Sequence, residues 1–208
     1  MRTGFPMILF YVFDRIRKVF RWVVCSVCGW ILCAFWGVVH GKNCKFIGRT
    51  LFRTHRRGEI VLGNGIRLFS TVLENPVGLT GPSILDTRRG GRIVIGDGSG
   101  LSSPVISSMV GVTIGKYCKI GGNARIFDHN FHGLDPDKRR MVKGYGDERP
   151  KPITIEDDVF IGTNAIILKG THIGARSVVA AGSVVFGLHI PPDSLVKGNP
   201  AVICERKR

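Results

Sequence analysis

Acidic residues are scarce in this sequence. Its 208 residues include 15 Asp and Glu against 30 Lys and Arg, which gives a formal net charge of +15 at neutral pH. Such a basic excess favours anionic partners, namely phosphorylated small molecules, a lipid surface or nucleic acid. The sequence contains neither zinc-finger spacing nor the aromatic motif of an RNA-recognition domain. Because the mean hydropathy is positive, at +0.15, we expect a membrane surface and no nucleic acid among the partners.

The sequence also lacks a second closely spaced cysteine pair. Cys25 and Cys28 have CxxC spacing, but apolar residues surround them and no other pair completes a metal site. We interpret them as small hydrophobic residues of a buried or lipid-facing helix. The scattered cysteines predict a reducing, cytoplasmic protein that holds no metal ion.

The amino-terminal segment combines apolar and basic residues. Residues 22–39 form an uncharged run, preceded by the basic stretch 14–21 and a second apolar stretch. The run is at the lower limit of length for a membrane span, its three tryptophans suit a membrane interface, and no cleavage site closes it. We therefore expect residues 1–42 to form two helices that lie in or dip into the inner leaflet. A true span, or a helix buried in an oligomer, remains an alternative.

Aliphatic residues recur every six positions in the second half of the chain. The longest series is Ile155, Ile161, Ile167, Ile173, Val179 and Val185. A period of six indicates a short strand and a turn, repeated and stacked into a solenoid. The sequence therefore predicts an all-β fold with a hexapeptide-repeat β-helix over 95–190. We expect irregular amino-terminal coils at 43–94 and a cap with a basic tail at 191–208.

The six-residue rhythm is interrupted over about 127–154. This interval is polar, charged and rich in Gly and Pro. A long loop in a regular solenoid is usually functional or disordered. Where the chain leaves the β-helix, Asp128 and His129 are adjacent and His132 follows. The residues alone leave three interpretations open: a general base with its helper, half a metal site, or ordinary loop residues.

Two segments carry a family resemblance, ITIEDDVFIGTNAIILKGTHIGARSVVAAGSVV and LVKGNPAVI. They resemble the hexapeptide-repeat acyltransferases, and most of all the galactoside and maltose acetyltransferases and the enzymes that acetylate surface polysaccharides. The similarity covers roughly residues 92–204. It implies a left-handed parallel β-helix with three hexapeptides per coil, and a homotrimer with active sites between subunits.

The resemblance also implies roles for individual residues. In the resembled family the extended loop carries the catalytic histidine, and His129 occupies that position. A neutral imidazole can remove the proton of a sugar hydroxyl that attacks a thioester, so no covalent enzyme intermediate is required. We expect Asp128 to orient the ring or contact the acceptor. We expect Ser102, Ser103 and His132 to contact the acceptor.

Acetyl-CoA is the expected co-substrate, bound along a groove between neighbouring subunits. Backbone N–H groups at small corner residues can hold the thioester oxygen. The resemblance suggests Gly162, Thr163, Ala181, Gly182 and Ser183 for this role. Relatives often carry basic residues after the final Asn-Pro-Ala, where this sequence has Val202 and Glu205. Lys197 and Arg206 are therefore the candidates for contacting the CoA phosphates.

These features together predict an acetyl-CoA-dependent O-acetyltransferase. It would transfer acetyl directly to a sugar hydroxyl of a capsule, exopolysaccharide or lipopolysaccharide precursor, either lipid-linked or a soluble nucleotide sugar. Since acetyl-CoA is cytosolic, we expect the cytoplasmic face of the bacterial inner membrane, with peripheral or monotopic attachment. An amino-sugar N-acetyltransferase is the alternative on the same residues. A zinc-dependent lyase of the γ-carbonic-anhydrase type, with His172 as third ligand, and a non-catalytic trimeric scaffold are alternatives of other classes.

Overall fold

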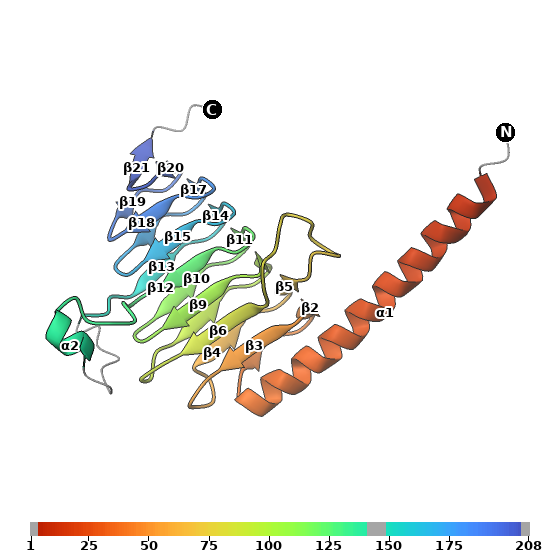
Figure 1. Cartoon of the computed structure of the whole chain (residues 1–208), viewed down its shortest axis with the longest axis horizontal. Helices are drawn as coiled ribbons and strands as arrows, with labels where there is room; N and C mark the ends of the chain where they lie inside the picture. Colours follow the sequence, from red (N-terminus) through yellow and green to blue (C-terminus); the bar gives the residue numbers. More distant parts are fainter. Residues whose placement is uncertain (1–3, 141–148, 205–208) are drawn as a thin grey trace.

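The computed structural model describes residues 4–140 and 149–204. Its strands stack into three sheets that form the walls of a β-helix (Figure 1). In spatial order, sheet A contains β1 (Val39–His40), β4 (Ile60–Leu62), β7 (Ile93–Ile95), β10 (Val112–Ile114), β13 (Ile153–Ile155), β16 (His172–Ile173) and β19 (His189–Ile190). Sheet C contains β18 (Val184–Phe186), β15 (Ile166–Leu168), β12 (Arg125–Phe127), β9 (Val105–Ser108), β6 (Ser83–Thr87) and β3 (Thr50–Arg53).

Sheet B is the third wall and ends the β-helix. It contains β2 (Lys45–Gly48), β5 (Arg67–Ser70), β8 (Gly100–Ser102), β11 (Lys119–Ile120), β14 (Phe160–Ile161), β17 (Val178–Val179), β20 (Leu195–Gly198) and β21 (Ala201–Cys204). Neighbouring strands of the three sheets are parallel, except that β21 folds back antiparallel on β20. The predicted hexapeptide-repeat architecture is therefore confirmed as a parallel β-helix.

The six-residue series supplies the interior of the β-helix. Ile155, Ile161 and Ile167 belong to one coil, each on a different sheet, and all three are fully buried. The equivalent residue of the next coil stacks on each in register, so that Ile155 pairs with Ile173. Small residues close the corners: a Cβ at Gly162 would clash with the backbone of Ala181 in the coil above. The period of six thus reflects one inward aliphatic residue per wall of the prism.

The amino-terminal coils are more regular than the sequence predicts. Over residues 43–94, where we expected irregular coils, β2 to β7 join the same three sheets with the same parallel pairing. Most of the irregularity lies in a loop at 71–82, which projects between β5 and β6 (Figure 1). The Asn75 amide donates to Ser102 Oγ at 2.7 Å and fastens this loop to the β-helix.

The amino-terminal segment forms one helix, α1 (Gly4–Trp36), so the expectation of two helices is wrong. The basic stretch does not interrupt the helix because Arg and Lys are good helix formers. It is also neutralised from outside, since Lys18 and Arg21 both form ion pairs with Glu74 of the 71–82 loop. The second half of α1 packs on β2, where Gly29 lies against the ring of Phe46.

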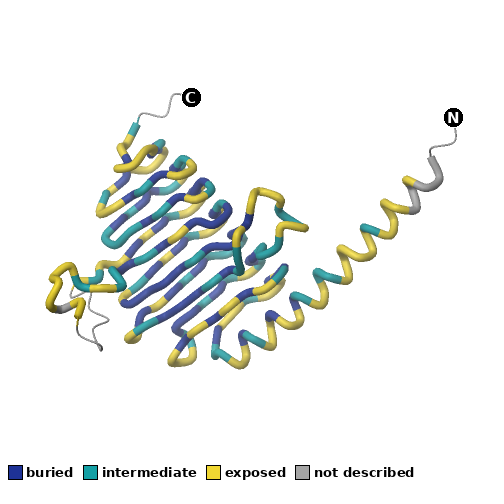
Figure 2. The backbone as a smooth tube through the Cα atoms, viewed as in Figure 1, coloured by how far each residue is buried: buried dark blue, intermediate teal, exposed yellow. Residues whose placement is uncertain are grey.

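The other side of α1 is exposed along the part of the helix whose side chains the structure describes (Figure 2). The exposed apolar side chains on this side include Phe13, Phe20, Val27, Ile31 and Phe35. Residues 10–36 are long and apolar enough to cross a membrane by length and composition, and only 17% of the most apolar window is buried. The β-helix therefore covers one side of the second half of α1 and leaves the described apolar side chains of the rest of the helix unpartnered.

The extended loop leaves the β-helix at the end of β12 and returns at β13. It includes the short helix α2 (Pro136–Arg140), whose first turn is capped by Asp135, which accepts a hydrogen bond from the Asp137 N–H at 2.8 Å. At its base, the Lys151 N–H donates to the Asp128 carbonyl at 2.9 Å. The loop is thus closed at its base, next to the two residues expected to form the catalytic pair.

Candidate active site

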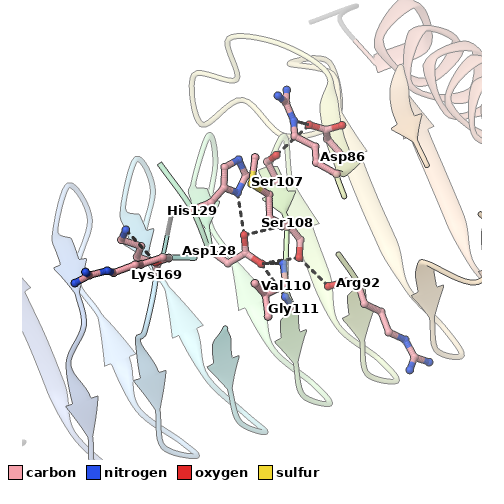
Figure 3. Close-up of polar contacts among 12 residues, drawn as sticks. Asp86, Arg92, Ser107, Ser108, Val110, Gly111, Asp128, His129 and Lys169 are labelled. Atoms are coloured by element: carbon pink, nitrogen blue, oxygen red, sulfur yellow. Dashed lines mark hydrogen bonds and ion pairs between the residues drawn. The ribbon is translucent and has the colours of Figure 1, made fainter. Parts of the chain in front are cut away.

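His129 lies at the corner where sheet C turns into sheet A. Because the strands of sheet C are parallel, β3, β6, β9 and β12 all end at this corner. Asp128 and His129 directly follow β12 and are buried, at 0% and 2% exposure. The imidazole Nδ1 lies 2.9 Å from Asp128 Oδ1 (Figure 3). The structure therefore brings together the two residues predicted to be catalytic.

The Asp128 carboxylate is held by the preceding coil. Its Oδ2 accepts hydrogen bonds from Ser108 Oγ at 2.7 Å, Val110 N at 2.9 Å and Gly111 N at 2.8 Å (Figure 3). Its Oδ1 accepts one from Met109 N at 2.8 Å, in addition to the bond from the imidazole. Burial alone would raise the pKa of Asp128, but these hydrogen bonds outweigh it and hold the pKa below its ordinary value. The carboxylate is consequently ionised at neutral pH.

The hydrogen-bond network assigns the tautomer of His129. An ionised carboxylate can only accept, so Nδ1 carries the ring proton of the neutral imidazole and Nε2 carries the lone pair. Nε2 is buried and has no hydrogen-bond partner among the described residues. The Phe131 ring lies beside the imidazole, with ring centroids 4.8 Å apart. Because Nε2 is enclosed, a neighbouring group such as the Phe131 ring must move before an acceptor hydroxyl can reach it.

A second buried carboxylate lies on the same edge of sheet C. Asp86, at the end of β6, accepts from Ser107 Oγ at 3.0 Å and from the guanidinium groups of Arg53 and Arg88. Burial would raise the pKa of Asp86, and the two arginines and Ser107 hold it below its ordinary value. Sequence reasoning missed this cluster. The sequence shows only a partial signal, the RRGG stretch at 88–91 that contains Arg88, because Arg53 meets Asp86 through the register of β3 and β6.

The residues expected to hold acetyl-CoA gather at another corner, where sheet B turns into sheet C. Gly162 and Thr163 follow β14, and Ala181, Gly182 and Ser183 occupy the equivalent place one coil above. The Gly182 N–H donates to the Thr163 carbonyl at 2.9 Å. Lys197, on β20, is exposed one coil further along the same edge. Arg206 lies outside the described residues.

The residues expected to contact the acceptor do not gather around His129. Ser102 and Ser103 lie at the corner of sheets B and C, so the full width of sheet C separates them from His129. Both are buried, and the Ser102 hydroxyl accepts the hydrogen bond from Asn75. His132 lies exposed in the loop just beyond Phe131. Of the three residues expected to contact the acceptor, only His132 lies on the same side of the β-helix as His129 within one chain.

His172, the third ligand required by a zinc site, lies elsewhere. It belongs to sheet A, where its Nε2 is 2.7 Å from Glu156 Oε1 and its Nδ1 is 3.1 Å from His189 Nδ1. Among the described residues, no group of three or more His, Cys, Asp or Glu is arranged to hold a metal ion. The histidine pair at the loop and His172 therefore do not converge on one point of this chain.

Comparisons with known proteins agree with this architecture. Residues 152–186 match the family model of the hexapeptide repeat of succinyl-transferase. A stretch of 52 residues, 25% of the chain, is 58% identical to part of a 2,3,4,5-tetrahydropyridine-2,6-dicarboxylate N-acetyltransferase of Clostridium perfringens, of which it covers 22%. The chain spans 22% to 40% of the length of the first curated relatives that it matches.

Solved structures show the same relationship. A hexapeptide-repeat acetyltransferase of Vibrio cholerae, complexed with acetyl-CoA, is 41% identical, with a TM-score of 0.50 over 57% of this chain and 62% of that one. A polysialic acid O-acetyltransferase shares the fold at 19% identity, with a TM-score of 0.62 over 80% of this chain and 72% of the other. The β-helix of this chain is thus of the type found in hexapeptide-repeat acetyltransferases.

Proposed function

We propose that the protein transfers an acetyl group from acetyl-CoA to a sugar hydroxyl of a cell-surface polysaccharide precursor. The observation that carries the proposal is the Asp128–His129 pair, whose fixed tautomer leaves a basic Nε2 without a partner in the described residues. In the reaction, the acceptor oxygen attacks the thioester carbon while its proton passes to Nε2. The C–S bond then breaks, and the CoA sulfur takes the proton and leaves as the thiol. Asp128 stabilises the intervening imidazolium.

Oxygen is the acceptor atom that makes most use of this pair. A neutral hydroxyl is a weak nucleophile, and its proton must leave as the C–O bond forms, so a positioned base assists the attack itself. An unprotonated amine can attack the thioester before it loses a proton. Similar proteins include both an N-acetyltransferase and a polysialic acid O-acetyltransferase. N-acetylation of an amino sugar is accordingly the second candidate.

The active site is completed by a second copy of the chain, and we propose a homotrimer. The corner expected to hold acetyl-CoA and the corner that holds His129 are opposite edges of sheet C, so one chain does not join them. The outward side chains of sheet C include partly exposed Ile166 and Val184 and exposed Phe186, which would suit an interface. In such an assembly, the corner that carries Ser102 and Ser103 would lie next to His129 of the neighbouring subunit.

The apolar side of α1 supports attachment to a membrane. Its exposed aromatic and aliphatic side chains share a helix with Arg15, Arg17, Lys18 and Arg21, the combination that binds helices to anionic bilayer surfaces. We propose a monotopic protein on the cytoplasmic face of the inner membrane, where acetyl-CoA is available. Its acceptor would then be assembled at that face.

The test is acetyl transfer from labelled acetyl-CoA to fractionated envelope glycans, followed by analysis of the labelled product. Base-stable label on nitrogen would favour the N-acetyltransferase, and base-labile ester would favour the O-acetyltransferase. His129→Gln should lower the rate by about 10²–10⁴, the usual contribution of a general base. A His129→Gln variant that keeps the wild-type rate would contradict the mechanism. Metal analysis of the purified protein tests the alternative of a zinc-dependent lyase. Protection by CoA against thermal unfolding would argue against the alternative of a non-catalytic scaffold.

A further inference from the structure

Two cavities adjoin each other on the His129 edge of sheet C, nearer the amino terminus. The first, the arginine pocket, has a volume of about 280 Å³ and is lined by Arg53, His55, Arg88, Arg89 and Met109. The second, of about 430 Å³, shares Arg53 and Arg88 and continues over apolar side chains to the end of α1. Its other lining residues are Trp36, Leu51, Phe52, Ile84, Asp86, Val105, Ser107 and Phe131. A positively charged pocket thus opens into a mainly apolar groove.

The two arginines shared by the cavities are held in place. Asp86, only 5% exposed, accepts from Arg53 Nε at 2.5 Å and Nη2 at 3.0 Å, and from Arg88 Nε at 2.6 Å. Arg89 adds a third positive charge, and no acidic residue is among the described residues lining the arginine pocket. A fork of arginines oriented in this way suits phosphate oxygens.

The arginine pocket lies at a definite distance from the base. Arg88 follows β6 and His129 follows β12, with the β9 coil between them, so two coil spacings of about 4.8 Å separate the two positions. Phe131 spans this gap, because its ring centroid is 4.8 Å from the His129 ring and 5.3 Å from Arg88 Cζ. The span is about the length of one sugar ring, so a sugar that joins a hydroxyl at His129 to a phosphate at Arg88 would take the place of the Phe131 ring.

We propose that the arginine pocket binds the phosphate of the acceptor, which is therefore a glycosyl phosphate or diphosphate. The phosphate lies on Arg88 and Arg89, the sugar takes the place of the displaced Phe131 ring, and the reacting hydroxyl lies at His129 Nε2. The inference rests on the proposed acetyl transfer, and it narrows the acceptor to phosphorylated sugars. Beyond the phosphate, the groove leads towards Trp36, and either a lipid or a nucleotide could occupy it.

Binding is tested first, on the full-length protein in detergent, with inorganic pyrophosphate as the probe. Arg89→Gln should weaken pyrophosphate binding about tenfold or more, as expected for a lost hydrogen bond between charged groups. Arg56→Gln is the matched control, since Arg56 is exposed at the equivalent corner of the preceding coil but does not line the pocket. His129→Gln should bind pyrophosphate as the wild type does. Equal weakening in Arg56→Gln and Arg89→Gln would indicate general charge attraction and would overturn the proposal.

Turnover is tested next, with the glycan fraction that accepts labelled acetyl, before and after mild acid removes its phosphate. Arg89→Gln should raise KM for the phosphorylated acceptor about tenfold, with kcat and KM for acetyl-CoA unchanged, and should not affect the dephosphorylated sugar. Equal turnover of both acceptors by the wild type would refute the phosphate inference while leaving acetyl transfer intact. Pyrophosphate binding without any acetyl transfer would instead refute the proposed function.

The same assay separates the two sources of phosphate. A nucleotide diphosphate sugar in solution is compared with a polyprenyl-diphosphate sugar in vesicles, at equal concentration. Either substrate used with the lower KM supports the proposal and identifies what fills the groove by Trp36. If neither is bound better by the wild type than by Arg89→Gln, the arginine pocket does not bind the acceptor phosphate.

Discussion

Replacing Asp128 with Asn tests how the base is prepared, because the side chain keeps its shape and loses its charge. Three donors meet Oδ2, from Ser108, Val110 and Gly111, and two meet Oδ1, from Met109 and His129. An amide NH₂ in place of Oδ2 would leave two backbone N–H groups without acceptors. In place of Oδ1 it would leave only the Met109 N–H unsatisfied, at about 1–3 kcal/mol. The second orientation is therefore favoured.

That orientation inverts the imidazole. The NH₂ group would donate to Nδ1, so the ring proton would move to Nε2 and the basic lone pair would no longer face the acceptor. Loss of the correct tautomer costs a triad enzyme about 10⁴ in kcat, and we expect a loss of 10³–10⁴ here. Thermal unfolding should show a protein that is folded and destabilised by about 1–3 kcal/mol.

The assay is the initial rate of acetyl transfer with saturating acetyl-CoA, measured beside His129→Gln. The two variants should lose similar factors in kcat, and the double variant should lose little more, because both changes remove one base. KM for acetyl-CoA should stay constant, since the residues expected to bind it lie across sheet C. A folded Asp128→Asn protein with kcat within tenfold of the wild type would refute the assignment of the tautomer.

Three further outcomes follow from the packing. The pKa of Asp128 in the folded protein lies below its unfolded value of about 3.9, so ionisation of Asp128 stabilises the fold above that pH, and this stability is lost as the pH falls further. In urea unfolding, the difference in free energy of unfolding between the wild type and Asp128→Asn should therefore shrink below about pH 4. Ile161→Ala should cost about 2–5 kcal/mol by denaturant unfolding, whereas Thr154→Ala on the outer surface should cost at most about 0.5. Phe20→Asp should reduce flotation with anionic vesicles and Phe20→Leu should not, if the exposed side of α1 enters the membrane; equal flotation of both would contradict that attachment.

The second half of the β-helix was predictable because its coils are short. From Ile155 to Val185 each wall contributes six residues, so the inward position recurs without a gap and the sequence shows it directly. In the amino-terminal coils the corner segments are longer, and the 71–82 loop adds a further insertion. These insertions remove the six-residue period from the sequence but leave the pairing of the strands unchanged. The strands there remain in register because neighbouring backbones, and not sequence spacing, set the stacking.

The candidate site divides in the same way. His129 was predictable from its place at the break in the rhythm, but its surroundings come from other coils. The backbone donors that fix Asp128 lie 17 to 19 residues away, and Asp86 lies 33 residues from Arg53. Such pairs meet only because a full turn of the β-helix brings them to one edge. For α1 the partner comes from an inserted loop, because Glu74 of the 71–82 loop pairs with the basic stretch and lies 53 residues from Arg21.

The parallel stacking of the coils also determines where each proposed binding site lies along the β-helix. A solenoid offers long edges, and here one edge of sheet C carries the base and the arginine pocket while the opposite edge carries the small residues expected to bind acetyl-CoA. In the proposed trimer, the two substrates would therefore approach from different subunits and meet where these edges adjoin. With α1 attached to a membrane as we propose, a phosphate bound in the arginine pocket would lie close to that membrane, because the pocket belongs to the coils next to α1. The acetyl donor would be bound by coils nearer the carboxyl terminus. A lipid-linked acceptor could place its phosphate in the arginine pocket and its sugar near the acetyl donor while its lipid stays in the bilayer.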